Sequence, residues 1–142
     1  MEEIKEKLEK AKQYLIKEIK CDAIVLFGSY SRNTQNKESD VDIGIKSPNK
    51  IQPKQLFEIK QKLEDILQKD VDLIDLENTQ DGIRYEILIN GITLYAKDKF
   101  RFELYKLDMY REYLELNESR KIIIDNIKNG GTIYGKWSRY YK

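Results

Sequence analysis

Asp40 and Asp42 are carboxylates at alternate positions, and ten residues separate them from an earlier glycine-serine pair, Gly28-Ser29. On a strand, side chains two positions apart point to the same face, with Cα atoms roughly 6.6 Å apart. Two like charges so placed repel each other unless a hard cation lies between them. Mg²⁺ binds through one or two carboxylates and leaves its other positions to water and substrate phosphates. The aspartate pair therefore indicates a metal site for a phosphorylated substrate.

The glycine-serine pair could hold the phosphates of that substrate. It follows an apolar, β-branched run at residues 23–27 that predicts a buried strand, and residues 43–45 predict a second strand after the aspartates. Glycine lets the backbone approach a ligand closely, and a short helix starting after it would point free N–H groups at an anion. Gly-Ser turns and Asp-x-Asp pairs are each common on protein surfaces. Their combination at this spacing, with a strand on each side, predicts a metal-nucleotide site.

This segment resembles the signature of the nucleotidyltransferase fold of the DNA polymerase β superfamily, and specifically its minimal nucleotidyltransferase (MNT) branch. The resemblance rests on Leu26-Phe27-Gly28-Ser29, on Ser39-Asp40-Val41-Asp42 and on Arg32. The chain has Ser31-Arg32-Asn33 where that branch commonly has Ala-Arg-Gly, a tolerable change because asparagine also accepts a left-handed conformation. The resemblance implies an α+β fold, a small mixed sheet flanked by helices.

The family takes a third metal-site carboxylate from a later strand. Residues 70–76 form the best candidate strand, and the resemblance assigns the role to Asp72. Asp75 points to the opposite face by parity, so we interpret Asp70 and Asp75 as strand ends. The implied catalytic and metal-binding residues are thus Asp40, Asp42 and Asp72, and the implied nucleotide-binding residues are Gly28, Ser29 and Arg32.

Composition excludes several other chemistries. The chain has 142 residues, enough for one core, and 26 Lys plus Arg against 25 Asp plus Glu give a net charge of +1. This balance argues against stable binding of long nucleic acid, which needs an excess of basic residues. There is no histidine, which removes ordinary zinc sites and Ser-His or Cys-His catalysis. The single cysteine, Cys21, is interpreted as a packing residue.

Residues 1–5 do not look like a secretory signal, and no apolar run reaches 18 residues. We therefore expect a cytoplasmic protein with no membrane segment.

Hydrophobic periodicity places the motifs on a series of alternating elements. Helices are expected over residues 2–19, 53–69, 79–90 and 98–128, and strands over residues 22–28, 39–46, 70–76 and 92–95. The last helix, whose apolar positions include Phe102, Leu107 and Met109, is either continuous or broken near Asn117. The aromatic, basic residues 134–142 are either a binding patch or a cap on the body. We expect a nucleotidyltransferase core at residues 1–97 and a helical extension of the same domain at residues 98–142.

The resemblance extends past the site to MNT antitoxins of HEPN ribonuclease toxins. It is carried by residues 84–88, by Asn90-Gly91, by Leu94-Tyr95 and by the long helix that follows. It implies an enzyme that uses Mg²⁺, with two ions expected, to transfer AMP from ATP to a tyrosine of a HEPN toxin, its partner in a hetero-oligomer. Two alternatives stay open. One is a small-molecule nucleotidyltransferase of the antibiotic-modifying kind, and the other is a catalytically idle antitoxin that acts by binding alone.

Overall fold

The chain alternates helices and strands as the periodicity predicts. The computed structural model describes residues 2–30 and 40–128. Every expected helix and strand is present, with ends within two residues of the prediction, and two short 3₁₀ helices follow β1 and β3. In order, the elements are α1 (Glu2–Glu18), β1 (Ala23–Phe27), η1 (Gly28–Tyr30), β2 (Val41–Lys46), α2 (Pro53–Leu67), β3 (Val71–Asp75), η2 (Leu76–Asn78), α3 (Asp81–Asn90), β4 (Ile92–Ala96) and α4 (Lys99–Lys128).

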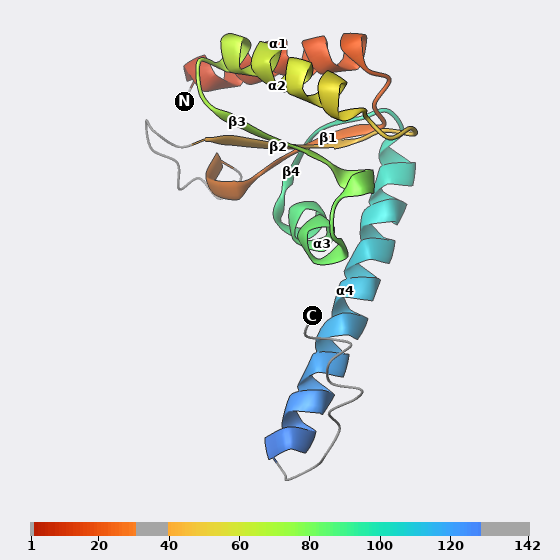
Figure 1. The fold of residues 1–142 in the computed structure, drawn as a ribbon. Helices are drawn as coiled ribbons and strands as arrows, with labels where there is room; N and C mark the ends of the chain where they lie inside the picture. Colours follow the sequence, from red (N-terminus) through yellow and green to blue (C-terminus); the bar gives the residue numbers. More distant parts are fainter. Residues whose placement is uncertain (1, 31–39, 129–142) are drawn as a thin grey trace.

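The strands form one mixed sheet in the order β3-β2-β1-β4. β1 is antiparallel to β2 and to β4, whereas β2 and β3 run parallel and are connected through α2. Helices α1 and α2 cover one face of the sheet, and α3 and α4 lie on the other side (Figure 1). The fold class is α+β, as expected.

Alternation along the strands divides the core into two layers. Leu15 of α1 and Leu63 of α2 are fully buried against Ile24 and Ile43, which share the upper face of the sheet in Figure 1. On the opposite face Val25 packs with buried residues of η2, α3 and α4, namely Leu76, Ile87, Leu88 and Phe102. Asp42 belongs to this second face by parity. The helices of the first layer therefore support the sheet from behind the candidate site.

Helix α4 is continuous through Asn117, which settles the alternative left open by the sequence. It starts beside the sheet and extends well past α3 (Figure 1). Residues 134–142, predicted to be a binding patch or a cap, lie outside the described residues. No helix in the described ranges is both long and apolar enough to cross a membrane.

Candidate nucleotidyltransferase site

Asp42 and Asp72 are direct partners in the register of the parallel strands β2 and β3. Side chains at paired positions of neighbouring strands lie on the same face, so both carboxylates belong to the face that also carries α3 and α4. The backbone fixes this register at the start of both strands, where Val41 N–H donates to Asp70 O at 2.9 Å. Asp72, chosen from the sequence by resemblance, is thus placed beside Asp42.

Gly28 lies next to Asp42, at the end of the neighbouring strand β1; we call this part of the sheet, with Asp72, the corner. It follows the last residue of β1, Phe27, which is the antiparallel partner of Asp42. Its φ is +71°, in the left-handed region that glycine adopts without strain. A Cβ built on Gly28 would overlap with the Asp42 carboxylate and would lie 2.9 Å from its Cγ. Gly28 and Asp42, the two parts of the sequence motif, are therefore in direct proximity.

The other predicted residues are less closely assembled. Asp40 is exposed and lies immediately before β2, two positions from Asp42. The backbone of Ser29 continues the chain through the 3₁₀ turn at Gly28–Tyr30. Arg32 lies outside the described residues. The structure thus brings Gly28, Asp42 and Asp72 together and leaves Asp40 at the entrance of β2.

The donor set suits a hard divalent cation. Among the side chains that the structure describes, no three of the Asp, Glu, Cys or His type gather closely enough to form a complete protein cage. Mg²⁺ does not require such a cage, because it usually takes one or two carboxylates and completes its shell with water and substrate phosphates. The two in-register carboxylates of Asp42 and Asp72, with Asp40 nearby in sequence, match that requirement. The sequence-based expectation of a magnesium site is compatible with this arrangement.

Asp75 has a structural role that the sequence did not reveal. Its side chain is buried on the α1/α2 face, opposite to Asp72, as parity predicted. Its two carboxylate oxygens accept hydrogen bonds from Ile51 N–H and from Glu77 N–H, each at 3.1 Å. These bonds connect the segment before α2 to the turn after β3. An aspartate at an inward position of an apolar strand was the only signal in the sequence.

Arg84 stabilises the chain between β3 and α3, again without a clear signal in the sequence. Its guanidinium donates to Leu76 O at 2.7 Å and to Thr79 O at 3.2 Å, and it lies 3.3 Å from the Asp81 carboxylate. It thereby satisfies the carbonyl group of Leu76 in the 3₁₀ turn η2 and that of Thr79 directly after it. The short stretch at residues 84–88 that carried part of the family resemblance therefore includes a packing role.

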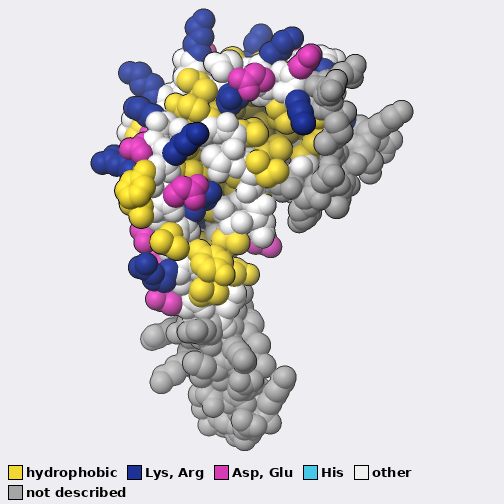
Figure 2. Space-filling view, turned by 180° about the vertical axis from the view of Figure 1, so that it is seen from behind, with side chains coloured by type: hydrophobic (Ala, Val, Ile, Leu, Met, Phe, Trp, Pro, Cys, Tyr) yellow, Lys and Arg dark blue, Asp and Glu magenta, His cyan; other side chains and the backbone are white. Residues whose placement is uncertain are grey.

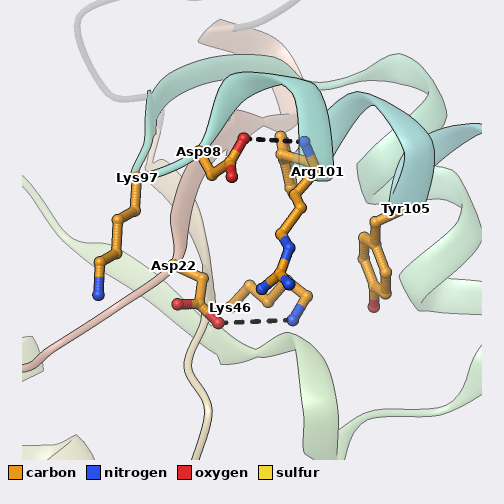
Figure 3. A pocket seen from close by; sticks show the side chains of 7 residues that line it. Asp22, Lys46, Lys97, Asp98, Arg101 and Tyr105 are labelled. Carbon is orange, nitrogen blue, oxygen red and sulfur yellow. Dashed lines mark hydrogen bonds and ion pairs between the residues drawn. The ribbon is translucent and has the colours of Figure 1, made fainter.

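A cavity of about 440 Å³ lies at the end of the sheet away from Asp42 and Asp72. Lys46, at the end of β2, lies 3.7 Å from Asp22 and 3.5 Å from Glu77, and its ammonium is 4.8 Å from the centre of the Tyr105 ring. Figure 3 shows Lys46, Arg101 and Tyr105 pointing into the same space. Asp98 holds the start of α4 by accepting a hydrogen bond from Arg101 N–H at 3.1 Å.

Packing separates this cavity from the aspartates. Gly44 lies between Asp42 and Lys46 on β2, and a Cβ at Gly44 would already be 3.2 Å from Leu76 and 3.3 Å from Ile87. Lys46 is therefore on the same face of β2 as Asp42, but an apolar contact lies between them. Burial and the nearby Glu77 carboxylate raise the pKa of Tyr105 to about 12. Tyr105 forms part of the wall of the cavity.

A small mixed sheet with a glycine turn against paired aspartates is the arrangement that the resemblance to a nucleotidyltransferase implied. A family model described as "Polymerase beta, Nucleotidyltransferase" matches residues 9–100. The chain belongs to this family, as the resemblance implied.

Within this family, the chain is similar to several known proteins. The chain is 32% identical over 108 residues to the protein adenylyltransferase MntA of Shewanella oneidensis, and the match covers 76% of this chain and 77% of MntA. It is also similar to a chain in the crystal structure of a toxin-antitoxin with AMP-PNP, with a TM-score of 0.70, 31% identity and coverage of 87% of this chain and 97% of that one.

A third similarity is to a chain in the structure of a tri-AMPylated HEPN toxin from Shewanella oneidensis in complex with its MNT antitoxin. The TM-score is 0.63 at 26% identity, and the match covers 84% of this chain and 98% of that one. One of these relatives is a protein adenylyltransferase, and the two solved structures are of toxin-antitoxin complexes, one of them with an AMPylated toxin.

Proposed function

We propose that this nucleotidyltransferase is an antitoxin-type protein adenylyltransferase that transfers AMP from ATP to a tyrosine of a cognate HEPN ribonuclease toxin and so neutralises it. The observation that carries the proposal is the in-register pair Asp42 and Asp72 against Gly28, in a chain 32% identical to the protein adenylyltransferase MntA. An antitoxin that acted by binding alone would have no need of this arrangement. The site therefore favours catalysis over contact.

Each residue of the corner has a chemical task in this proposal. The backbone at Gly28 and Ser29 holds the phosphates of ATP, because a glycine lets a ligand approach the backbone closely. The tyrosine oxygen of the acceptor attacks the α-phosphorus, the bond from that phosphorus to the bridging oxygen breaks, and pyrophosphate leaves. Asp72 takes the hydroxyl proton or orients the hydroxyl for attack. Arg32 is retained from the resemblance as a residue that steadies the triphosphate.

We also infer that the reaction depends on Mg²⁺ held by Asp40, Asp42 and Asp72, with two ions expected. Bound there, the metal would neutralise charge on the attacking and leaving oxygens. Asp42 would provide a carboxylate ligand from β2, beside Gly28, and Asp72 would provide one from the neighbouring strand β3. Removing divalent cations with EDTA should abolish AMP transfer, and added Mg²⁺ should restore it. Transfer that persists in EDTA would contradict metal dependence.

We retain the division into a nucleotidyltransferase core at residues 1–97 and a helical extension at residues 98–142. Phe102 supports the view that both belong to one domain, because it is buried in the same apolar cluster as Val25 and Ile87. The first turn of the helical extension therefore packs into the hydrophobic core that it shares with residues 1–97.

The experiment that tests the function uses the protein encoded by the neighbouring gene as acceptor. It is mixed with this chain, ATP and Mg²⁺, and its intact mass is measured. Whole AMP units should be added by the unmutated chain and by the control Asp70→Asn, an exposed aspartate at the start of β3. Asp42→Asn should add none. Transfer by Asp42→Asn at the unmutated rate would overturn the assignment, as would the absence of transfer by the unmutated chain.

A further inference from the structure

Helix α4 carries two apolar faces. One face packs on the body: Phe102 is buried, Tyr105 and Met109 contact the same cluster, and the ring of Tyr113 lies 6.4 Å from that of Tyr85. The other face is defined by positions separated by three or four residues, which lie side by side on a helix. We call this second face the α4 stripe, and it consists of Phe100, Leu104, Leu107, Tyr110 and Leu114.

The α4 stripe is exposed. Its exposed fractions are 74% for Phe100, 47% for Leu104, 54% for Leu107, 45% for Tyr110 and 43% for Leu114. These are five of the eight exposed large hydrophobic side chains in the described part of the chain. Figure 2 shows apolar side chains reaching the surface among the charged groups. A helix that only supported the sheet would need the first face alone.

Four residues of the α4 stripe also line a groove. Between the end of α3 and the first half of α4 lies a groove of about 470 Å³, to which α3 contributes Leu88 and Ile89. Two charged side chains line this groove, Glu103 and Lys106, and they form an ion pair with each other at 2.9 Å. The groove therefore offers no net charge to an occupant. It suits the apolar side of a protein partner and gives little attraction to a free anion or to nucleic acid.

The apolar area of the α4 stripe is that of a specific, non-obligate protein–protein interface. With roughly 200 Å² for a full aromatic side chain and roughly 150 Å² for leucine, the exposed fractions of the stripe amount to about 450 Å² of apolar surface. About 57% of the area of a non-obligate interface is apolar. If the stripe supplied this apolar part, the whole interface would bury about 800 Å² per partner, which is the standard size. Obligate homodimers bury about 1,000 Å² per chain or more, of which about 65% is apolar, so they need about 650 Å² of apolar surface per chain, more than the stripe has. The stripe is therefore better matched to a different protein than to a second copy of this chain.

We propose that the α4 stripe is the surface on which the acceptor protein docks for AMP transfer, an inference that rests on the proposed function. Helices α3 and α4 lie on the side of the sheet that carries Asp42 and Asp72, as Figure 1 and the strand register agree. A protein bound along α4 is thus on the same side of the sheet as the carboxylates. Binding energy from the stripe holds the acceptor while its tyrosine enters the site.

The test measures complex formation without ATP, so it does not depend on catalysis. The acceptor protein from the neighbouring gene is titrated onto the unmutated chain and onto Phe100→Asp and Leu107→Asp. Both positions are more than half exposed, so the variants should fold. The matched control is Phe57→Asp, which changes an exposed phenylalanine on α2, across the sheet. We expect the Kd to rise at least 100-fold for the stripe variants and to stay within 3-fold for the control.

Two further measurements separate docking from catalysis and from self-association. ATP binding by the stripe variants should equal that of the unmutated chain, because Gly28, Asp42 and Asp72 are untouched. Sedimentation should show the chain alone as a monomer. An unchanged Kd in the stripe variants overturns the docking proposal even if AMP transfer occurs. If the unmutated chain self-associates, and the stripe variants lose this self-association but bind the acceptor as before, the stripe is the interface with a second copy of this chain. A complex that needs the stripe but transfers no AMP would leave docking standing and overturn the proposed function.

Discussion

The carboxylate of Asp42 occupies the space into which a side chain on Gly28 would project, so the two residues can be neighbours only because Gly28 has no Cβ. The φ of +71° at Gly28 adds a second reason, because L residues with a side chain rarely adopt that conformation. One glycine thus fixes both the backbone turn after β1 and the position of a carboxylate on β2. This contact links the two halves of the motif that the sequence analysis singled out.

Gly28→Ala should therefore reduce AMP transfer at least 100-fold, because Asp42 must move. The strained φ and the overlap should also lower the free energy of unfolding by about 1–3 kcal/mol. Transfer rates and urea unfolding curves measure the two effects. The control is Gly82→Ala in the first turn of α3, where a Cβ would meet nothing within 4 Å. That variant should transfer normally, and normal transfer by Gly28→Ala would contradict the proposed role.

Asp75→Ala should affect stability. It removes the acceptor of two backbone hydrogen bonds and leaves the N–H groups of Ile51 and Glu77 without this partner. Because the carboxylate is buried, we expect a loss of about 2–4 kcal/mol in the free energy of unfolding. Asp70→Ala, at an exposed position, should change it by less than about 0.5 kcal/mol. Equal unfolding midpoints for the two variants would show that Asp75 does not hold the turn.

The contrast between Asp72 and Asp75 shows how far the sequence could be interpreted. Parity on one strand was enough to separate their faces, and the resemblance chose Asp72. The parallel register that places Asp72 beside Asp42 could not be predicted from periodicity, because α2 separates the two strands. The partner of Asp75, Ile51 N–H, is 24 residues away and lies outside any regular element, so no local pattern indicates it.

Helix α4 shows a second limit. Its continuous apolar periodicity predicted a helix correctly, but Phe102 and Leu107 belonged to a single apolar set in that analysis. The structure divides them, with Phe102 buried in the core and Leu107 on the exposed stripe. A helix with apolar residues on two sides gives the same composition signal as a helix buried all round. Only packing shows which side is free for a partner.

The sequence predicted a helix that ends at residue 90, and α3 does end at Asn90, directly before Gly91. The reason is packing, since Gly91 has an extended backbone with φ of −79° rather than a left-handed one. A Cβ there would overlap with Ile87 O and with the Val25 side chain, because α3 and β4 meet β1 at this point. Gly91→Ala should lower the free energy of unfolding by about 1–3 kcal/mol, measured in urea. An unchanged midpoint would mean that the backbone moves aside without cost.

Tyr85 gives the fold a dependence on alkaline pH. Its hydroxyl donates to the Glu112 carboxylate at 2.9 Å, and burial together with this bond raises the pKa of Tyr85 to about 12 from the ordinary value of 10. Between pH 10 and pH 12 the unfolded chain has lost this proton while the folded chain keeps it, so the free energy of unfolding falls as pH rises. Tyr85→Phe should be less stable than the unmutated chain at pH 8 by about 1 kcal/mol.

The difference between the two proteins should shrink as pH approaches 12, because phenylalanine has no proton to lose. Urea unfolding at pH 8, 10 and 11.5 measures the convergence, and the exposed Tyr110→Phe serves as a control for general alkaline effects. Curves for Tyr85→Phe and the unmutated chain that stay parallel over this range would show that the hydroxyl of Tyr85 is not stabilised by its place between α3 and α4.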